Sequence, residues 1–213
     1  MNASRRACLL TGPAMLAVAL VACSSPATLY YRLMAVPGAV QTAAPMTVAV
    51  RSVSIPGYLN RDGIAKAGAA YRFEFYSNDL WADQLSAMLQ AIMVQDLAQR
   101  LPAATVLASG GSIEASSDVL VEINILRFDP DSSGNLVLSA QIAIKSGPTR
   151  RLWATQSFAR SSALSLSGAG ADGPDAAEIV AKMSALWAAM ADQVAALIAQ
   201  YQAARPGAGS GSG

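Results

Sequence analysis

Few side chains in this sequence are of a reactive or catalytic type, and the thiol of Cys23 is the most informative of them. The chain has 213 residues, two cysteines and no histidine. Without histidine there is no Ser-His-Asp or Cys-His nucleophile pair and no histidine-ligated metal site. The carboxylates Glu74, Asp79 and Asp83 would favour an enzyme only if they converged in one cleft. We therefore expect no catalytic residue, no cofactor and no metal site.

Cys23 stands at the end of a segment with the features of a secretory signal. Arg5 and Arg6 precede an apolar run over residues 14–22, which is shorter than the roughly 20 residues that a bilayer-spanning helix needs. The stretch Leu20-Val21-Ala22-Cys23 resembles the lipobox of bacterial lipoproteins. That resemblance implies cleavage between Ala22 and Cys23 and attachment of lipid to Cys23. The alternatives are an ordinary secretory signal that contains a cysteine and, from the arginine pair, a twin-arginine signal.

Cleavage at this position would change the charge balance of the chain. Loss of residues 1–22 removes two arginines and no acid, and leaves 13 basic and 14 acidic side chains, a net charge of −1. This balance gives no electrostatic reason to expect nucleic-acid binding. We expect a signal peptide over 1–22, a lipidated tether over 23–27, one domain over 28–204 and a disordered Gly/Ser tail over 205–213.

Hydrophobic periodicity predicts the elements of that domain. Alternating apolar residues indicate strands over 28–33, 47–53 and 71–76, and an antiparallel meander of three strands between 119 and 160. Apolar stripes of helical period predict one helix that begins at an N-cap at Asn78 or Asp79 and ends at Leu101-Pro102, and a second from Pro174 to Tyr201. The predicted class is α+β, an antiparallel β-sheet with two amphipathic α-helices packed on one face.

Three stretches, taken in order, suggest a family. They are Val50-Arg51-Ser52-Val53-Ser54-Ile55-Pro56-Gly57-Tyr58-Leu59-Asn60-Arg61, Asn78-Asp79-Leu80-Trp81-Ala82-Asp83-Gln84-Leu85, and Val94-Gln95-Asp96-Leu97 followed by Leu101-Pro102. They resemble signatures of the auxiliary lipoproteins of ABC-type and paraquat-inducible (PqiC-like) transport systems. With the lipobox, the meander and the final helix, the resemblance covers nearly the whole mature chain.

The resemblance implies a non-enzymatic role in the envelope of a Gram-negative bacterium. Such lipoproteins partner with an MCE-domain protein and its associated inner-membrane permease, and dock the end of a tunnel through which lipids cross the periplasm. Related lipoproteins also form ring-like oligomers, so homo-oligomerisation is a further expectation. Ser24 after the lipidated cysteine favours the periplasmic face of the outer membrane. A general envelope-assembly role, in lipopolysaccharide or outer-membrane protein biogenesis, is the alternative function.

Four residues are the candidates for docking a partner: Tyr58, Leu59 and Arg61, which follow a Pro-Gly turn, and Trp81. Loops carry binding residues disproportionately, and tryptophan is enriched among interface hot spots. Each also has a structural interpretation. Tyr58 and Leu59 would cap the end of the sheet, Arg61 would pair with an acid, and Trp81 would fix the start of the first helix to the core.

Overall fold

The computed structural model describes residues 26–68, 71–113, 115–165 and 174–203. The predicted signal peptide over 1–22, the predicted lipidation site Cys23 and the predicted tail over 205–213 lie outside the described residues. Within those described ranges, no helix is both long and apolar enough to cross a bilayer.

The larger sheet has five strands in the order β5-β2-β6-β7-β8. Its main part is the predicted antiparallel meander of β6 (Val119–Pro130), β7 (Asn135–Ser146) and β8 (Leu152–Ala163). Every second side chain of β7 is buried, as expected for a strand with one face on the core. The meander prediction is therefore confirmed.

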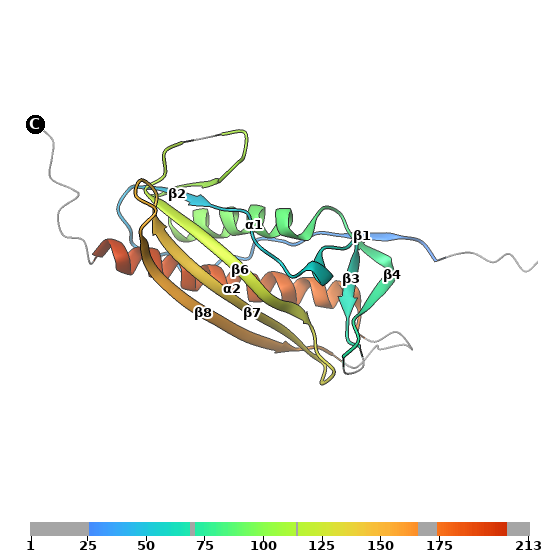
Figure 1. The fold of residues 1–213 in the computed structure, drawn as a ribbon. Helices are drawn as coiled ribbons and strands as arrows, with labels where there is room; N and C mark the ends of the chain where they lie inside the picture. The colour runs from blue at the N-terminus through green and yellow to red at the C-terminus, as the bar shows by residue number, and fades with distance from the viewer. Residues whose placement is uncertain (1–25, 69–70, 114, 166–173, 204–213) are drawn as a thin grey trace, which may run out of the picture.

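Two helices lie side by side on one face of this sheet, as Figure 1 shows. They are α1 (Leu85–Arg100) and α2 (Ala176–Ala203), and both contribute buried apolar side chains to a single core. Trp187 of α2 is fully buried, and its indole N–H donates to the Leu89 carbonyl of α1 at 3.1 Å. The predicted α+β class, with two helices on one sheet face, is confirmed.

A second sheet lies at one end of the molecule and has the order β1-β4-β3 (Figure 1). Its strands are β1 (Leu29–Tyr31), β3 (Gly63–Lys66) and β4 (Glu74–Trp81). We call this part of the molecule the small-sheet end. A short 3₁₀ helix, η1 (Gly57–Leu59), connects the two sheets along the chain.

The strand pairing differs from the all-antiparallel sheet that we predicted. β1 is parallel to β4, and β2 (Thr47–Val50) is parallel to both β5 (Thr105–Ala108) and β6. These parallel pairs join segments that are distant in the sequence, and periodicity gives no information on strand direction. The short strands β3 and β5 were also not predicted, since four residues are too few to show a clear alternation.

The first helix begins later than predicted. Asn78 and Asp79 do not cap it, because both belong to β4, and the helix starts at Leu85 after Gln84. Residues 79–81 pair with Leu29–Tyr31 of β1. This pairing supplies backbone hydrogen bonds in a strand, so the tertiary contact decides the conformation of a segment that sequence alone assigned to a helix.

Candidate docking surface

Of the four predicted docking residues, two are buried, one is half-buried and one is exposed. Leu59 and Trp81 are only 5% and 7% exposed, and both line the same small internal cavity beside Leu85 and Phe128. They pack in the core, and Trp81 does so from the end of β4 rather than from a helix start. In this conformation neither side chain is available to a partner.

Tyr58 is half-buried and Arg61 is exposed, and both lie beside the small-sheet end. The Tyr58 hydroxyl donates to Asp129 Oδ1 at 2.7 Å, and its ring stacks on Phe73 with centroids 4.1 Å apart. Burial, reinforced by the neighbouring Asp129 carboxylate, raises the pKa of the Tyr58 hydroxyl, so it stays a hydrogen-bond donor. The Arg61 guanidinium lies 5.4 Å from the centroid of the Phe75 ring, within cation–π range.

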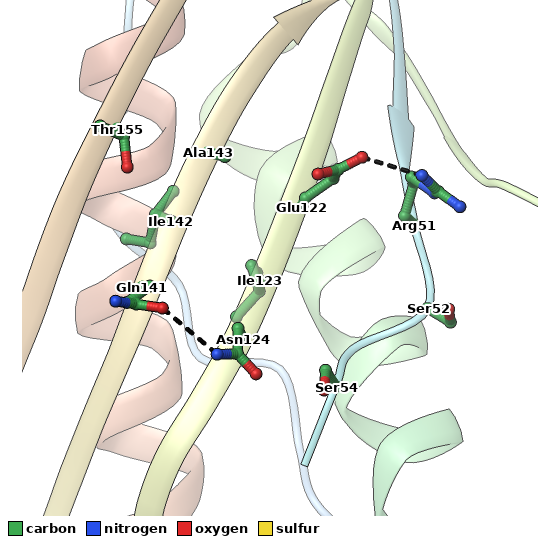
Figure 2. Close-up of a pocket in the computed structure, with 10 residues that line it drawn as sticks. All are labelled: Arg51, Ser52, Ser54, Glu122, Ile123, Asn124, Gln141, Ile142, Ala143 and Thr155. Carbon is green, nitrogen blue, oxygen red and sulfur yellow. Dashed lines mark hydrogen bonds and ion pairs between the residues drawn. The ribbon is translucent and has the colours of Figure 1, made fainter. Parts of the chain in front are cut away.

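The uncovered face of the five-stranded sheet carries a groove of about 470 Å³, shown in Figure 2. We call it the sheet groove. The helices lie behind the sheet on its other face, so the groove opens to solvent. Its lining is mostly polar and comes from the segment after β2 and from three strands of the meander: Arg51, Ser52, Ser54, Glu122, Ile123, Asn124, Gln141, Ile142, Ala143 and Thr155.

One acid at the sheet groove contacts two cations. Glu122 accepts from Arg51 Nη1 at 2.9 Å and from Lys145 Nζ at 2.6 Å. The hydrogen bond from Lys145 is the main cause that holds the pKa of Glu122 below its usual range. Beside this cluster, the Asn124 amide donates to Gln141 Oε1 at 3.3 Å. Such a polar lining suits the surface of another protein better than an acyl chain.

Only an indirect signal for this groove is present in the sequence. The alternation of β6 placed Glu122 and Asn124 on the polar face, and the same holds for Gln141 on β7. Nothing in the sequence showed that Arg51, some 70 residues earlier, lies beside Glu122. The parallel pairing of β2 with β6 creates that contact.

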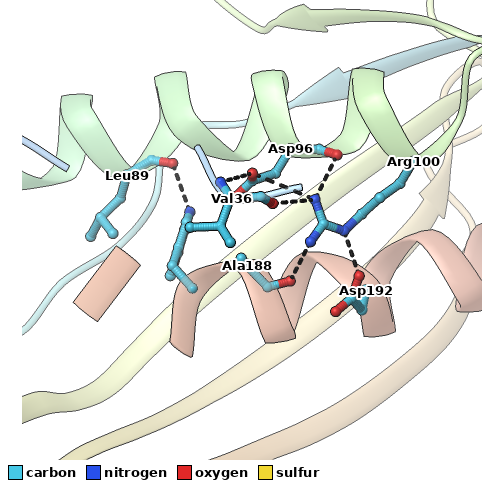
Figure 3. Close-up of polar contacts among 7 residues, drawn as sticks. Val36, Leu89, Asp96, Arg100, Ala188 and Asp192 are labelled. Atoms are coloured by element: carbon cyan, nitrogen blue, oxygen red, sulfur yellow. Dashed lines mark hydrogen bonds and ion pairs between the residues drawn. The ribbon is translucent and has the colours of Figure 1, made fainter. Parts of the chain in front are cut away.

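A second polar cluster is buried between the helices and is shown in Figure 3. Arg100, whose side chain is 1% exposed, donates to Asp192 Oδ1 at 2.6 Å and to the carbonyls of Val36, Asp96 and Ala188 at 3.1–3.2 Å. Asp96 in turn accepts from the Val36 amide at 3.0 Å. One guanidinium thus connects α1, α2 and the extended segment after β1.

This buried cluster has the properties of a structural clamp. The Asp96 carboxylate lies 3.5 Å from Arg100 Nη1, yet its second oxygen, Oδ2, is buried without a hydrogen-bond partner. Burial raises the pKa of Asp96 to about 6, against the opposing effects of the Val36 amide and Arg100. Because the carboxylate is 0% exposed, a substrate could not reach it without opening the helix pair.

The three carboxylates that would favour an enzyme do not converge. Glu74 and Asp79 are five positions apart on β4, which places them on opposite faces of the strand. Glu74 pairs with Arg72, Asp79 accepts from the Tyr31 hydroxyl at 3.0 Å, and Asp83 accepts from the Gln84 amide at 2.7 Å. Among the residues that the structure describes, no group of three or more acidic or cysteine side chains is placed to hold a metal ion.

Comparison with known proteins supports the sequence resemblance. Residues 31–195 match the profile of the family described as the ABC-type transport auxiliary lipoprotein component. A search of curated proteins finds no match. Among solved structures, a protein from Xanthomonas campestris of the family DUF330 is 14% identical, with a TM-score of 0.65 over 84% of this chain and 99% of that one. An uncharacterised protein is 18% identical, with a TM-score of 0.64 over 81% of this chain and 99% of that one. Both similarities concern the fold.

Proposed function

We propose that this chain, which belongs to the family of ABC-type transport auxiliary lipoprotein components, is a docking component of an MCE-type intermembrane lipid transport system. It would be anchored by lipid to the periplasmic face of the outer membrane and would act without catalysis. The observation that carries the proposal is the family match over residues 31–195, which spans nearly all of the described domain.

The anchor is assigned to Cys23. Each acyl chain contributes about 0.8 kcal/mol per buried CH₂, and two or more chains hold a protein on a membrane stably. β1 begins at Leu29, so the tether between the anchor and the folded domain is short. A protein held in this way is restricted to the membrane surface, which raises its effective concentration for a partner that spans the periplasm.

Docking is assigned to the sheet groove. The groove is open and polar, while Leu59 and Trp81 of the predicted docking set are buried. Its central Glu122 is fixed between Arg51 and Lys145, so a partner would meet a pre-organised charge pattern. The partner is the MCE-domain protein or its associated inner-membrane permease.

Co-purification from membranes in a gentle detergent tests the proposal. The full-length protein should float with the outer membrane and capture an MCE-domain protein, and Cys23→Ala should lose the membrane association. Absence of any MCE partner, together with binding of lipopolysaccharide, would instead support the general envelope-assembly role.

Two exposed arginines provide a matched comparison for the docking surface. Arg51→Glu reverses a charge in the sheet groove, and Arg61→Glu makes the same change at the small-sheet end. We expect Arg51→Glu to reduce the captured partner about tenfold or more and Arg61→Glu to leave it within about twofold. If Arg61→Glu instead reduced capture and Arg51→Glu did not, docking would be assigned to the loop predicted from the sequence. Equal capture by both variants would show that the sheet groove is not the docking site.

A further inference from the structure

We propose that the small-sheet end rests on the phospholipid bilayer, with the side chains of Tyr30, Tyr71 and Phe73 in the headgroup region. This inference rests on the lipid anchor at Cys23 in the proposed function. It adds an orientation, namely that the meander strands extend away from the membrane and keep the sheet groove accessible to a periplasmic partner.

Exposed apolar and aromatic side chains are concentrated at this end. Leu29 and Tyr30 of β1 are 53% and 68% exposed, Phe73 is 55% exposed, and Tyr71 is fully exposed just before β4. Tyrosine rings favour the membrane–water interface, because the ring is apolar while the hydroxyl can stay hydrated. The Phe73 ring stacks on Tyr58, and the remaining exposed surfaces of Tyr30, Tyr71 and Phe73 would face water if the protein did not contact a membrane.

The backbone of Tyr71 supports a binding role for its side chain. Its φ is +67°, in the left-handed region that a bulky residue rarely adopts. This conformation costs on the order of 1 kcal/mol, and strained residues of this kind concentrate at functional sites. Here the strained residue carries a ring that contacts solvent on all sides, next to the exposed Phe73.

The length of the tether keeps Leu29, the first residue of the small sheet, near the bilayer. Six residues separate Cys23 from Leu29, and at roughly 3.5 Å per residue they reach about 20 Å at most. The opposite end lies farther away, since β8 has 12 residues and therefore spans roughly 40 Å. The turn between β7 and β8 lies at the far end of the molecule from the small sheet (Figure 1). β8 begins directly after this turn, at Leu152.

Two ion pairs lie at the small-sheet end and beside it on β6. Arg72 contacts Glu74, and Arg127 contacts Asp129 at 3.1 Å. The contact with lipid is therefore made by apolar and aromatic side chains, and it does not require anionic headgroups.

Tryptophan fluorescence in vesicles tests the orientation. The full-length acylated protein is inserted into vesicles of phosphatidylethanolamine and phosphatidylglycerol that contain a dibrominated phosphatidylcholine, whose bromines quench nearby indoles. Tyr71→Trp reports on the small-sheet end, and Leu152→Trp is the matched control, because Leu152 is also exposed, at 50%, on the far end. The signal of the unsubstituted protein, which comes from the buried Trp81 and Trp187 and the half-buried Trp153, is subtracted.

We expect the new indole of Tyr71→Trp to be quenched at least threefold more than that of Leu152→Trp. Equal quenching, or stronger quenching of Leu152→Trp, would overturn the orientation. The outcomes also separate the two proposals. If the unsubstituted protein fails to float with the vesicles, the anchor fails and this inference fails with it. If the protein floats while Tyr71→Trp is not quenched, only the orientation is wrong, and a protein partner or a second copy covers these rings instead.

Discussion

Substitution of Asp96 by asparagine should remove most of the pH dependence of folding stability between pH 5 and pH 7.5. The ordinary pKa of 3.8 is raised to about 6 in the folded protein, with burial as the largest cause and the charge of Asp192 as a smaller one. The folded state therefore binds this proton more tightly than the unfolded state does. The resulting stabilisation is complete below pH 3.8 and is lost as the pH rises through 6.

The size of the effect follows from these two pKa values. Lowering the pH from 7.5 to 5 should increase the free energy of unfolding by about 1.4 kcal/mol, and full protonation should contribute about 3 kcal/mol. The chain has no histidine, so the side chain that usually titrates in this range is missing. The pKa values of Glu122 and Asp131 are lowered, so their contributions are lost only at more acidic pH.

Urea unfolding of the full chain, followed by circular dichroism at pH 5, 6 and 7.5 and constant ionic strength, measures this slope. The unsubstituted protein should become more stable towards pH 5, and Asp96→Asn should give a nearly flat profile. Asp83→Asn is the control, because Asp83 is exposed and remote from the clamp, and it should keep the original slope. If Asp96→Asn kept that slope, or if the unsubstituted protein lost stability towards pH 5, the assigned role of Asp96 would be refuted.

Three further substitutions and one control test buried and half-buried contacts, each by urea unfolding at pH 7.5. Arg100→Ala should lower the free energy of unfolding by about 3–5 kcal/mol, since it leaves the buried Asp96 carboxylate without its counterion. A Cβ at Gly38 would overlap the guanidinium of Arg100, so Gly38→Ala should lower the free energy of unfolding by about 1–3 kcal/mol. Gly57→Ala is the control. No atom lies within 4 Å of a Cβ at that position, so this substitution should change the free energy of unfolding by less than about 0.5 kcal/mol. Tyr58→Phe keeps the stacked ring but removes the hydrogen bond to the Asp129 carboxylate, so it should lower the free energy of unfolding by about 1.5 kcal/mol. A decrease below about 0.3 kcal/mol would argue against that hydrogen bond.

The strong periodic signals in the sequence were sufficient for the main part of the fold. The meander strands are long enough to show alternation, and the stripes of α1 and α2 follow the helical period, because in both cases one face must be buried. The sequence stretches that resemble the auxiliary lipoproteins also indicated the family, which the match over residues 31–195 confirms.

The docking candidates show the limit of local reasoning. A tryptophan near a predicted helix start can face either the core or a partner, and only the pairing of β4 with β1 shows that Trp81 is buried. The clamp was not predicted either. Asp96 and Arg100 are four residues apart on α1, which suggests an ordinary surface pair, and it is the packing of α2 and the segment around Val36 that buries them.

The sequence by itself determined the elements with a regular period, the absence of histidine chemistry and the position of the motif that resembles a lipobox, because each of these depends on residue types at short spacing. Only the tertiary structure decided which strands are parallel, which charges are buried and which aromatic rings remain exposed. Those properties depend on contacts between segments tens of residues apart, and burial is a property of the packed chain rather than of any one residue.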